Sequence, residues 1–290
     1  MKKLILKYHF FVLGCIGFVL NSCNSKFRVW VGTNNEQKIY NLKYGEHKKQ
    51  KMDVFLPSDY PVTSPVVLIV HGGAWKYGRK EHMIHIQKML FKNNIPSINM
   101  NYRLVSKGIT YKKQLEDIRT AIEKFNSLAE KAELQPNNYI ILGESAGGHL
   151  ALLYGYKNPE QIKKIISLSA PTDFYSKEYL NSFYSKYSSP TVQRVVGTKF
   201  QRKKLSKEFE KASPIANISN VPTLLFQGNR DFLVNKRQGL SLDSALTRLN
   251  VPHKLVFMKG AGHAPRFFSK RKRDSMIYPN ILDWIKNDPL

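Results

Sequence analysis

Short apolar runs alternate with amphipathic stretches along most of the chain. The run 66–70 is apolar at every position, and further strand-like runs occupy 95–100, 139–142, 162–168, 223–226 and 254–258. Continuous apolar runs of this length are typical of strands buried on both faces of a parallel sheet. Helices are predicted between these runs, at 83–91, 111–134, 146–156 and 278–285, where apolar residues recur at helical spacing. This alternation predicts an α/β fold with a central, mostly parallel sheet flanked by helices.

The first residues have the pattern of an export signal. Three lysines precede the apolar run Phe10–Leu20, whose eleven residues are too few to cross a bilayer, which takes about 20. The next residues, Leu20-Asn21-Ser22-Cys23, resemble the lipobox of bacterial lipoproteins, in which the cysteine receives lipid and becomes residue one. We therefore expect a signal peptide at 1–22 and a lipid anchor at Cys23, in the outer membrane or on the periplasmic face. Cys15 is a second candidate with a shorter apolar run; a plain signal peptide and an uncleaved anchor are the alternatives.

The rest of the chain is predicted to form a single domain. Residues 23–43 are polar and suggest a tether followed by a first edge strand, and the domain proper extends over 44–290. A polar, aromatic and basic segment at 175–211 interrupts the alternation and is predicted to be a lid-like excursion. No repeat or low-complexity linker divides the sequence.

Charge is the unusual feature of the composition. The 290 residues carry 46 Lys and Arg against 21 Asp and Glu, a net charge of +25, and only three of the lysines belong to the predicted signal peptide. Such a balance favours an anionic partner, either nucleic acid, a membrane surface or an acidic polymer. Export and the lack of zinc-finger spacing or an RNA-recognition motif argue against nucleic acid. A basic face on anionic lipid, attraction of acidic glycans and a merely solvated lysine-rich surface stay open.

A candidate nucleophile stands between one predicted strand and the helix that follows it. The sequence Gly143-Glu144-Ser145-Ala146-Gly147-Gly148 is a G-x-S-x-G motif in the context of strand, sharp turn and helix. A serine on such a strained elbow needs glycine two positions before and after it, because a Cβ atom there would strike neighbouring backbone. Ser145 is thus predicted to be a catalytic nucleophile at a helix N-terminus, which favours a developing oxyanion.

A serine hydroxyl needs a base, and later strands supply the candidates. Residues 223–231 form a predicted strand and a glycine turn that end at Asp231; residues 255–263 repeat this pattern and end at His263. The order serine, acid, histidine is the one found in this kind of fold. Asp173 is the rival acid, one strand earlier, and His253, at a strand start, is the rival histidine.

The second half of an oxyanion site is predicted after the run 66–70. His71-Gly72-Gly73-Ala74-Trp75 resembles the H-G-G-G-type motif, which supplies backbone N–H donors. We expect the donors to be Gly73, Ala74 and Ala146, with His71 bracing the loop. Trp75 and Glu144 are expected to contact substrate, although Trp75 is equally suited to loop packing.

Together these motifs resemble the α/β-hydrolases, in particular the esterase/lipase group with the hormone-sensitive-lipase-like enzymes and the bifunctional acetyl-xylan and feruloyl esterases. The resemblance rests on Tyr44-Gly45, 51–57, 71–75, 101–104, 143–150, 213–215 and 260–263. It implies an eight-stranded, mostly parallel sheet, carboxylic-ester hydrolysis and no metal or organic cofactor. Ala74 replaces the third glycine of the H-G-G-G form, and 102–104 lacks the Ala-Pro-Glu that follows in many relatives, which leaves the substrate pocket undefined.

The sequence therefore predicts a serine hydrolase that cleaves short acyl, acetyl or feruloyl-type esters of a small molecule or glycan. The alternatives are the same triad in an aryl formamidase or a peptidase, and a non-catalytic, lipid-anchored binding protein on this fold. His82 and His85 lie three residues apart without an H-E-x-x-H motif, so no metal site is expected. The sequence does not indicate an oligomeric state.

Overall fold

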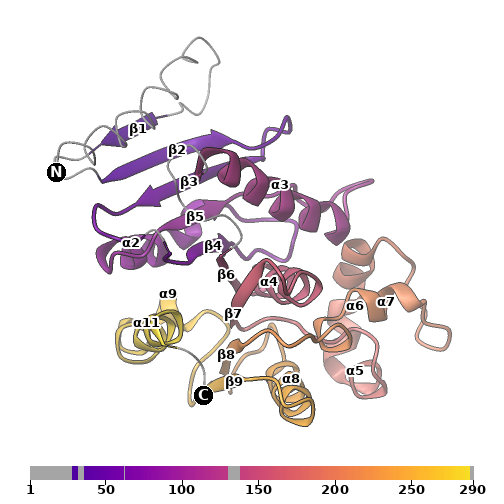
Figure 1. The fold of residues 1–290 in the computed structure, drawn as a ribbon. Coiled ribbons are helices and arrows are strands. Elements are labelled where there is room, and N and C mark those ends of the chain that lie inside the picture. Colours follow the sequence, from indigo (N-terminus) through magenta and orange to yellow (C-terminus); the bar gives the residue numbers. More distant parts are fainter. Residues whose placement is uncertain (1–27, 32–35, 62, 130–137, 288–290) are drawn as a thin grey trace.

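The computed structural model describes residues 28–31, 36–61, 63–129 and 138–287, which are built around one twisted sheet (Figure 1). The strand order is β1-β2-β3-β5-β4-β6-β7-β8-β9. All neighbours from β5 to β9 pair in parallel, whereas β1, β2 and β3 join the edge beside β5 with antiparallel pairing. The strands are β1 (Arg28–Val31), β2 (Gln37–Lys43), β3 (Lys51–Leu56), β4 (Val66–Val70), β5 (Ser97–Met100), β6 (Tyr139–Glu144), β7 (Ile162–Leu168), β8 (Thr223–Gly228) and β9 (His253–Met258). The predicted α/β fold is confirmed, and the short β1 extends the expected sheet at its edge.

Helices cover both faces of the sheet. On one face lie α2 (Ile84–Lys92) and α11 (Tyr278–Lys286); on the other lie α3 (Tyr111–Ala129), α4 (Ala146–Lys157) and α8 (Arg237–Arg248). A 3-10 turn, η1 (Lys80–Met83), leads into α2. The chain closes through the short α9 (Pro265–Phe268), α10 (Lys270–Lys272) and the π-helical turn η4 (Arg273–Ile277).

The segment 175–211 forms three helices beyond α4, on the side of the molecule away from α11 (Figure 1). They are α5 (Lys177–Asn181), α6 (Phe183–Val196) and α7 (Lys207–Lys211), and the 3-10 turn η3 (Pro214–Ala216) follows them. Serine side chains cap each of the three helices: Ser176, Ser182 and Ser206 accept hydrogen bonds from backbone N–H groups of the first turn. These caps explain why so polar a segment is helical.

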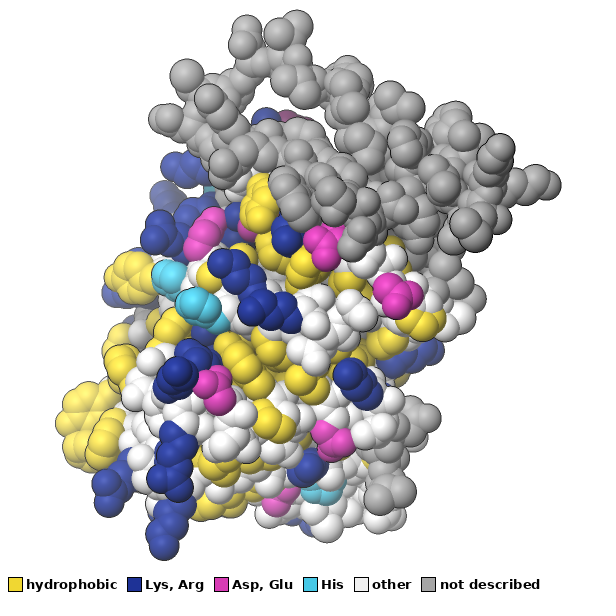
Figure 2. Space-filling view, turned by 90° about the vertical axis from the view of Figure 1, so that its left-hand side faces the viewer, with side chains coloured by type: hydrophobic (Ala, Val, Ile, Leu, Met, Phe, Trp, Pro, Cys, Tyr) yellow, Lys and Arg dark blue, Asp and Glu magenta, His cyan; other side chains and the backbone are white. Residues whose placement is uncertain are grey.

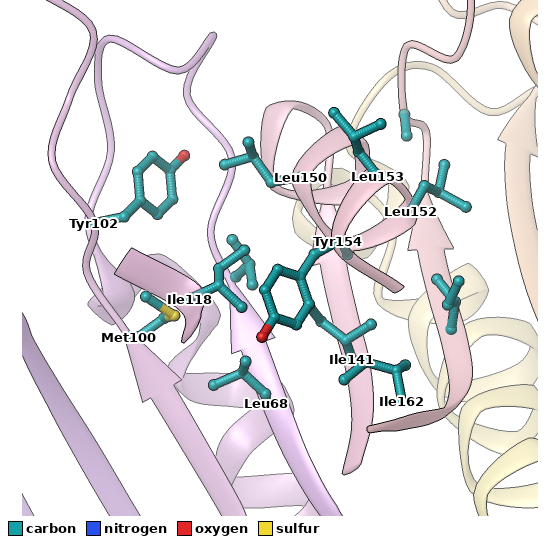
Figure 3. Close-up of a cluster of buried hydrophobic side chains, with 14 of the residues drawn as sticks. Leu68, Met100, Tyr102, Ile118, Ile141, Leu150, Leu152, Leu153, Tyr154 and Ile162 are labelled. Atoms are coloured by element: carbon teal, nitrogen blue, oxygen red, sulfur yellow. The ribbon is translucent and has the colours of Figure 1, made fainter. Parts of the chain in front are cut away.

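Strand residues point alternately into two apolar cores, one on each face. In β4, Val66, Leu68 and Val70 belong to the core under α3 and α4, whereas Val67 and Ile69 face α2 and α11. Figure 3 shows Leu68 and Ile141 of the sheet against Ile118 of α3 and Leu150 of α4. Burying each side chain of this size contributes about 1.5–3 kcal/mol. A sheet buried on both faces explains why its strands read as unbroken apolar runs.

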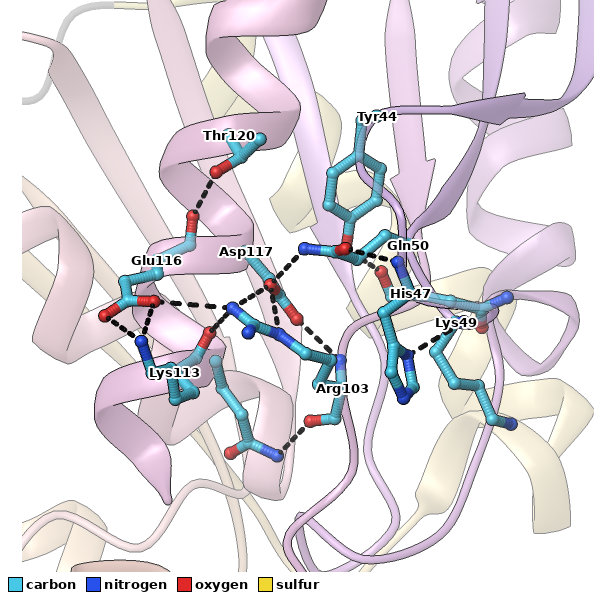
Figure 4. A network of polar contacts seen from close by, with 11 residues as sticks. Tyr44, His47, Lys49, Gln50, Arg103, Lys113, Glu116, Asp117 and Thr120 are labelled. Carbon is cyan, nitrogen blue, oxygen red and sulfur yellow. Dashed lines mark hydrogen bonds and ion pairs between the residues drawn. The ribbon is translucent and has the colours of Figure 1, made fainter. Parts of the chain in front are cut away.

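A buried carboxylate ties α3 to the segments before β3 and after β5 (Figure 4). Asp117 is fully buried and accepts hydrogen bonds from the Gln50 amide at 2.8 Å and from the backbone N–H of Arg103 at 2.6 Å. The Arg103 guanidinium also bonds this carboxylate, with Nε at 2.8 Å. Nearby, the Tyr44 hydroxyl donates to the carbonyl of Asn101, and burial raises the pKa of that hydroxyl. The motifs around residues 44 and 101–103 therefore have a structural role.

The Lys and Arg side chains are spread out where α2 and α11 cover the sheet. Figure 2 shows them scattered among uncharged side chains, with fewer acidic residues between them. None of the helices in the described ranges is both long and apolar enough to span a bilayer. The predicted signal peptide and Cys23 lie outside the described residues.

A second buried ion pair joins η1 to β3. Lys80 and Asp53 are almost completely buried, and Lys80 Nζ lies 2.8 Å from Asp53 Oδ2. Burial raises the pKa of Asp53, and the Lys80 ammonium opposes that rise. The pair fixes the end of the loop 71–79, because Lys80 follows it directly.

Removing one member of this pair should destabilise the fold. In Lys80→Met, Asp53 would stay buried without its cation, and we expect the free energy of unfolding to fall by about 3–5 kcal/mol. Chemical denaturation followed by circular dichroism measures this change. The matched control is Arg119→Ala, which breaks the exposed Arg119–Glu123 pair on α3 and should change stability little. Equal effects of the two substitutions would contradict the structural role of the buried pair.

Candidate active site

Ser145 stands on a sharp elbow between β6 and α4. Its backbone has φ 55° and ψ −121°, a strained conformation for a residue with a Cβ atom. Glycine is required on both sides: a Cβ on Gly143 would lie 2.1 Å from the carbonyl oxygen of Gly147, and a Cβ on Gly147 would lie 2.2 Å from that of Val70. The Ser145 N–H donates to the carbonyl of Leu168 at 2.7 Å. Its hydroxyl is therefore held at the carboxyl end of the sheet.

The structure brings Ser145, His263 and Asp231 together although they are distant in sequence. His263 Nε2 lies 2.8 Å from Ser145 Oγ, and His263 Nδ1 lies 2.8 Å from Asp231 Oδ2. The other carboxylate oxygen of Asp231 accepts backbone N–H groups from Leu233 at 3.0 Å and Val234 at 2.8 Å. Asp231 is buried, whereas His263 keeps partial access to the cavity. The three side chains form one chain of hydrogen bonds.

The rival residues lie in other surroundings. The Asp173 carboxylate accepts backbone N–H groups from Tyr175 at 2.9 Å and Ser176 at 3.0 Å and receives the Ser176 hydroxyl, so it organises the start of α5. The Nδ1 atom of His253 lies 2.7 Å from the carbonyl oxygen of Val251, at the start of β9. The sequence left both alternatives open, and the structure places neither beside Ser145.

The loop after β4 turns its backbone toward the same site. Gly73, Ala74 and Trp75 have consecutive positive φ angles of 122°, 49° and 59°. Gly73 and Ala74 line the cavity together with Ser145. Ala146 is the first residue of α4, where a helix leaves backbone N–H groups without intrahelical partners. The three predicted backbone donors thus belong to the two segments that border the Ser145 hydroxyl.

Buried aromatic contacts brace this loop. The rings of His71 and Tyr102 stack with centroids 4.2 Å apart, and the Tyr102 hydroxyl donates to the His71 carbonyl at 2.8 Å. The Trp75 indole borders the cavity but is almost completely buried, and its N–H donates to His149 Nδ1 at 3.1 Å. Gln114 of α3 donates to the Trp75 carbonyl at 2.9 Å. Trp75 therefore combines the two roles between which the sequence did not decide: loop packing and part of the cavity wall.

Arg266 is the residue of this site that sequence reasoning missed. Its Nε and one terminal nitrogen lie 2.7 Å from the two carboxylate oxygens of Glu144, and it also donates to the carbonyl of His82 at 3.0 Å. Only 1% of the Arg266 side chain and 8% of the Glu144 side chain are exposed. Glu144 was expected to contact substrate; it lines the cavity, but its carboxylate is held by Arg266. The only signal in the sequence was a cation three positions after His263.

The cavity beside Ser145 has a volume of about 820 Å³. Its walls come mainly from the loop 72–77, α6, the loop 231–235 and the segment 263–267, and they include seven Phe, Tyr and Trp side chains. His82 borders it, whereas His85 lies on the exposed side of α2. Within the described ranges, no three His, Cys, Asp or Glu residues come together as a metal site would require.

A serine elbow followed in chain order by an acid and a histidine, at the carboxyl ends of parallel strands, defines an α/β-hydrolase. A model of the BD-FAE family matches residues 52–246, which is most of the chain. The chain belongs to the BD-FAE family.

Curated relatives are more distant. The isoprenylcysteine alpha-carbonyl methylesterase ICME of Arabidopsis thaliana is 24% identical over 80% of this chain and 58% of the relative. Esterase LipC of Mycobacterium tuberculosis is 25% identical over 76% of this chain and 58% of the relative. The kynurenine formamidase of Salmo salar is 24% identical over 40% of this chain and 38% of the relative. The chain spans about three fifths of the length of the first relatives it matches.

Solved structures show the same fold. The chain is similar to a truncated carbohydrate esterase from gut microbiota, with a TM-score of 0.69, 18% identity and coverage of 86% of this chain and 98% of that one. It is also similar to esterase 2 of Thermogutta terrifontis, with a TM-score of 0.64, 19% identity and 89% of each chain covered. At these identities, the similarity establishes the fold.

The buried histidine behind Trp75 is expected to make the stability of the fold depend on pH. His149 is fully buried, accepts from Trp75 at Nδ1 and lies 2.7 Å from the carbonyl oxygen of Ala212 at Nε2. Burial lowers its pKa to about 4, so it stays neutral at pH 7. An unfolded histidine, with a pKa of about 6.5, binds its proton at higher pH. Protons therefore favour the unfolded chain as the pH falls from about 6.5 to about 4.

We expect His149→Gln to flatten this dependence. Glutamine offers one acceptor and one donor for the same partners but does not titrate. In the unchanged chain, this one group should remove about 3 kcal/mol of the free energy of unfolding between pH 6.5 and pH 4. Urea denaturation at several pH values measures the slope for both proteins. The expectation fails if the two slopes are equal.

Proposed function

We propose that this protein is a serine hydrolase that cleaves carboxylic esters through an acyl-enzyme. The observation that carries the proposal is the hydrogen-bonded chain from Ser145 Oγ through His263 to Asp231, beside the backbone of Gly73 and Ala74. The esterases among its relatives support the same reaction. A binding protein on this fold would have no need for the three side chains in this arrangement.

In the first step, Ser145 Oγ attacks the ester carbonyl while its proton passes to His263 Nε2. The Asp231 carboxylate holds Nδ1–H and stabilises the imidazolium. The negative oxygen of the tetrahedral intermediate accepts the N–H groups of Gly73, Ala74 and Ala146, each of which is worth about 3 kcal/mol of barrier.

The first intermediate then collapses: its bond to the alcohol oxygen breaks, the alcohol leaves with the proton that His263 carries, and Ser145 remains acylated. A water molecule then loses a proton to His263 and attacks the acyl carbonyl. Collapse of the second intermediate returns the proton to Ser145 and releases the acid. His263 thus acts as base and acid in turn, and Asp231 stays ionised throughout.

The size and lining of the cavity favour an ester with a bulky apolar or aromatic part. About 820 Å³ is far more than an acetyl group fills, so an acetyl ester would use the space for its alcohol and a feruloyl-type ester for its acyl ring. Phe183, Tyr184 and Phe232 supply apolar walls for either. Aryl formamide hydrolysis by the same triad is the second candidate, favoured by the relative named kynurenine formamidase.

Loss of the nucleophile should abolish the reaction. We expect turnover of p-nitrophenyl acetate and labelling by a fluorophosphonate probe to disappear in Ser145→Ala, whereas Ser127→Ala on α3 should retain both. Methyl ferulate, acetylated xylan and N-formylkynurenine, with Ser145→Ala as the blank, would rank the substrate classes. A Ser145→Ala protein that is still fully active would refute the mechanism.

The same assay distinguishes the two candidate acids. Asp231→Asn should lower kcat by about four orders of magnitude, because the amide cannot hold His263 in the required tautomer. Asp173→Asn should have a far smaller effect, since that carboxylate lies at the start of α5. The reverse order would assign the acid to Asp173.

Arg266 is proposed as a positioning residue. Arg266→Gln would leave the Glu144 carboxylate buried and unpaired in the cavity wall, one residue before Ser145, so we expect kcat to fall about tenfold or more with little change in KM. The double variant Glu144→Gln, Arg266→Gln removes both charges and should recover part of kcat. Failure of the double variant to recover any kcat, although it is folded, would argue against this charge effect.

A further inference from the structure

Exposed apolar side chains gather around the mouth of the cavity. Ten large apolar side chains are exposed in the described part of the chain, and seven of them belong to one group that we call the rim. Six members line the cavity and the seventh, Phe268, follows Phe267 directly; the rim is Tyr77, Phe183, Tyr187, Phe232, Leu233, Phe267 and Phe268. Large exposed apolar patches of this kind mark surfaces that meet a partner.

The side chains of the rim are more exposed to solvent than the binding of a small ligand inside the cavity requires. Phe232 is 91% exposed and Phe268 is 89% exposed, so a molecule within the cavity would leave most of both rings in water. Phe183 is 70% exposed and packs against Tyr187, with ring centroids 4.7 Å apart. A surface that lies across the mouth would cover the outer parts of these rings.

Cations accompany every part of the rim. Lys76 precedes Tyr77, Lys186 lies between Phe183 and Tyr187, and Lys236 comes three positions after Leu233. After Phe268 come Lys270, Arg271 and Lys272. All of these side chains are exposed except that of Lys272, which is partly buried.

Acidic residues near the rim are few and already paired. Asp231 bonds His263, Glu178 pairs with Arg237, and Asp274 pairs with Arg273. The surroundings of the mouth are therefore both apolar and positively charged.

We propose that the rim docks on an anionic phospholipid bilayer, with the mouth of the cavity facing the membrane. Phenylalanine and leucine gain by leaving water for the acyl boundary, and surrounding lysine and arginine side chains gain from anionic headgroups. Most of the rim carries no polar group that could bond a glycan or a protein surface. The proposal goes beyond ester hydrolysis and does not depend on it, because docking needs no reaction at Ser145.

Vesicle binding by the full chain tests the proposal. Every protein carries Cys23→Ser, which prevents lipid attachment at the predicted site and leaves the N-terminal residues identical in all variants. Binding to phosphatidylglycerol and to phosphatidylcholine vesicles is measured by co-sedimentation at low and high salt. We expect binding to phosphatidylglycerol that weakens in salt, and much less binding to phosphatidylcholine.

Two matched variants locate the docking surface. Phe232→Ser with Phe268→Ser should weaken binding to phosphatidylglycerol at least tenfold, whereas Leu249→Ser with Phe257→Ser, exposed residues outside the rim, should change it little. Lys270→Gln with Arg271→Gln should weaken it several-fold and leave the rim apolar. Thermal denaturation verifies that each variant is folded.

Three results would overturn the proposal. They are equal binding by the rim variant and its control, equal binding to both kinds of vesicle, and no vesicle binding at all. Hydrolysis of p-nitrophenyl acetate is followed in parallel with Ser145→Ala as the blank. Loss of hydrolysis with intact vesicle binding would reject the proposed function and leave the docking surface in place. Intact hydrolysis without vesicle binding would reject the docking surface and leave the proposed function in place.

Discussion

Backbone contact around the nucleophile elbow is the constraint on which the other parts of the site depend. Gly143, Gly147 and the carbonyl of Val70 come so close that no side chain fits between them, which joins β6, α4 and β4 at one point. The Ser145 N–H donates to the carbonyl of Leu168 at the end of β7, which fixes the position of the serine backbone. Its strained backbone is sustained by this packing on every side. The histidine and the acid reach a hydroxyl whose position is already set.

Buried charges then fix the loops that surround the elbow. Each is paired with a partner from a distant segment: Glu144 with Arg266 across 122 residues, and Lys80 with Asp53 across 27. Such pairs add little net stability compared with apolar packing, yet breaking one leaves an uncompensated charge. The main effect of these pairs is therefore to fix the positions of the segments that they join. The first pair holds the segment after His263 against the elbow, and the second holds the end of the loop that contains Gly73.

Much of the fold was predictable because a sheet buried on both faces leaves unbroken apolar runs, and the elbow leaves glycines at a fixed spacing. Chain order then pointed to Asp231 and His263, but only the structure shows both within hydrogen-bonding distance. The pairing of Arg266 with Glu144 has no local signal, since the partners are far apart in sequence. The helices of 175–211 depend on serine caps in a polar segment, and β1 depends on pairing with β2. Nor can a sequence show that Phe232 and Phe268 are exposed, because an apolar residue normally indicates burial.

An anionic surface as partner accounts for both the exposed rim and the net charge of +25. Seven exposed apolar side chains around one opening would favour association between copies of the chain. A large net charge of one sign opposes that association, because each approach of two copies meets repulsion. The same cations favour an anionic surface, where repulsion is replaced by attraction and the apolar side chains leave water. Positive charge therefore opposes burial of the rim between two copies of the chain and favours its burial on an anionic surface. Because the rim surrounds the mouth of the cavity, such a surface would lie where substrate enters.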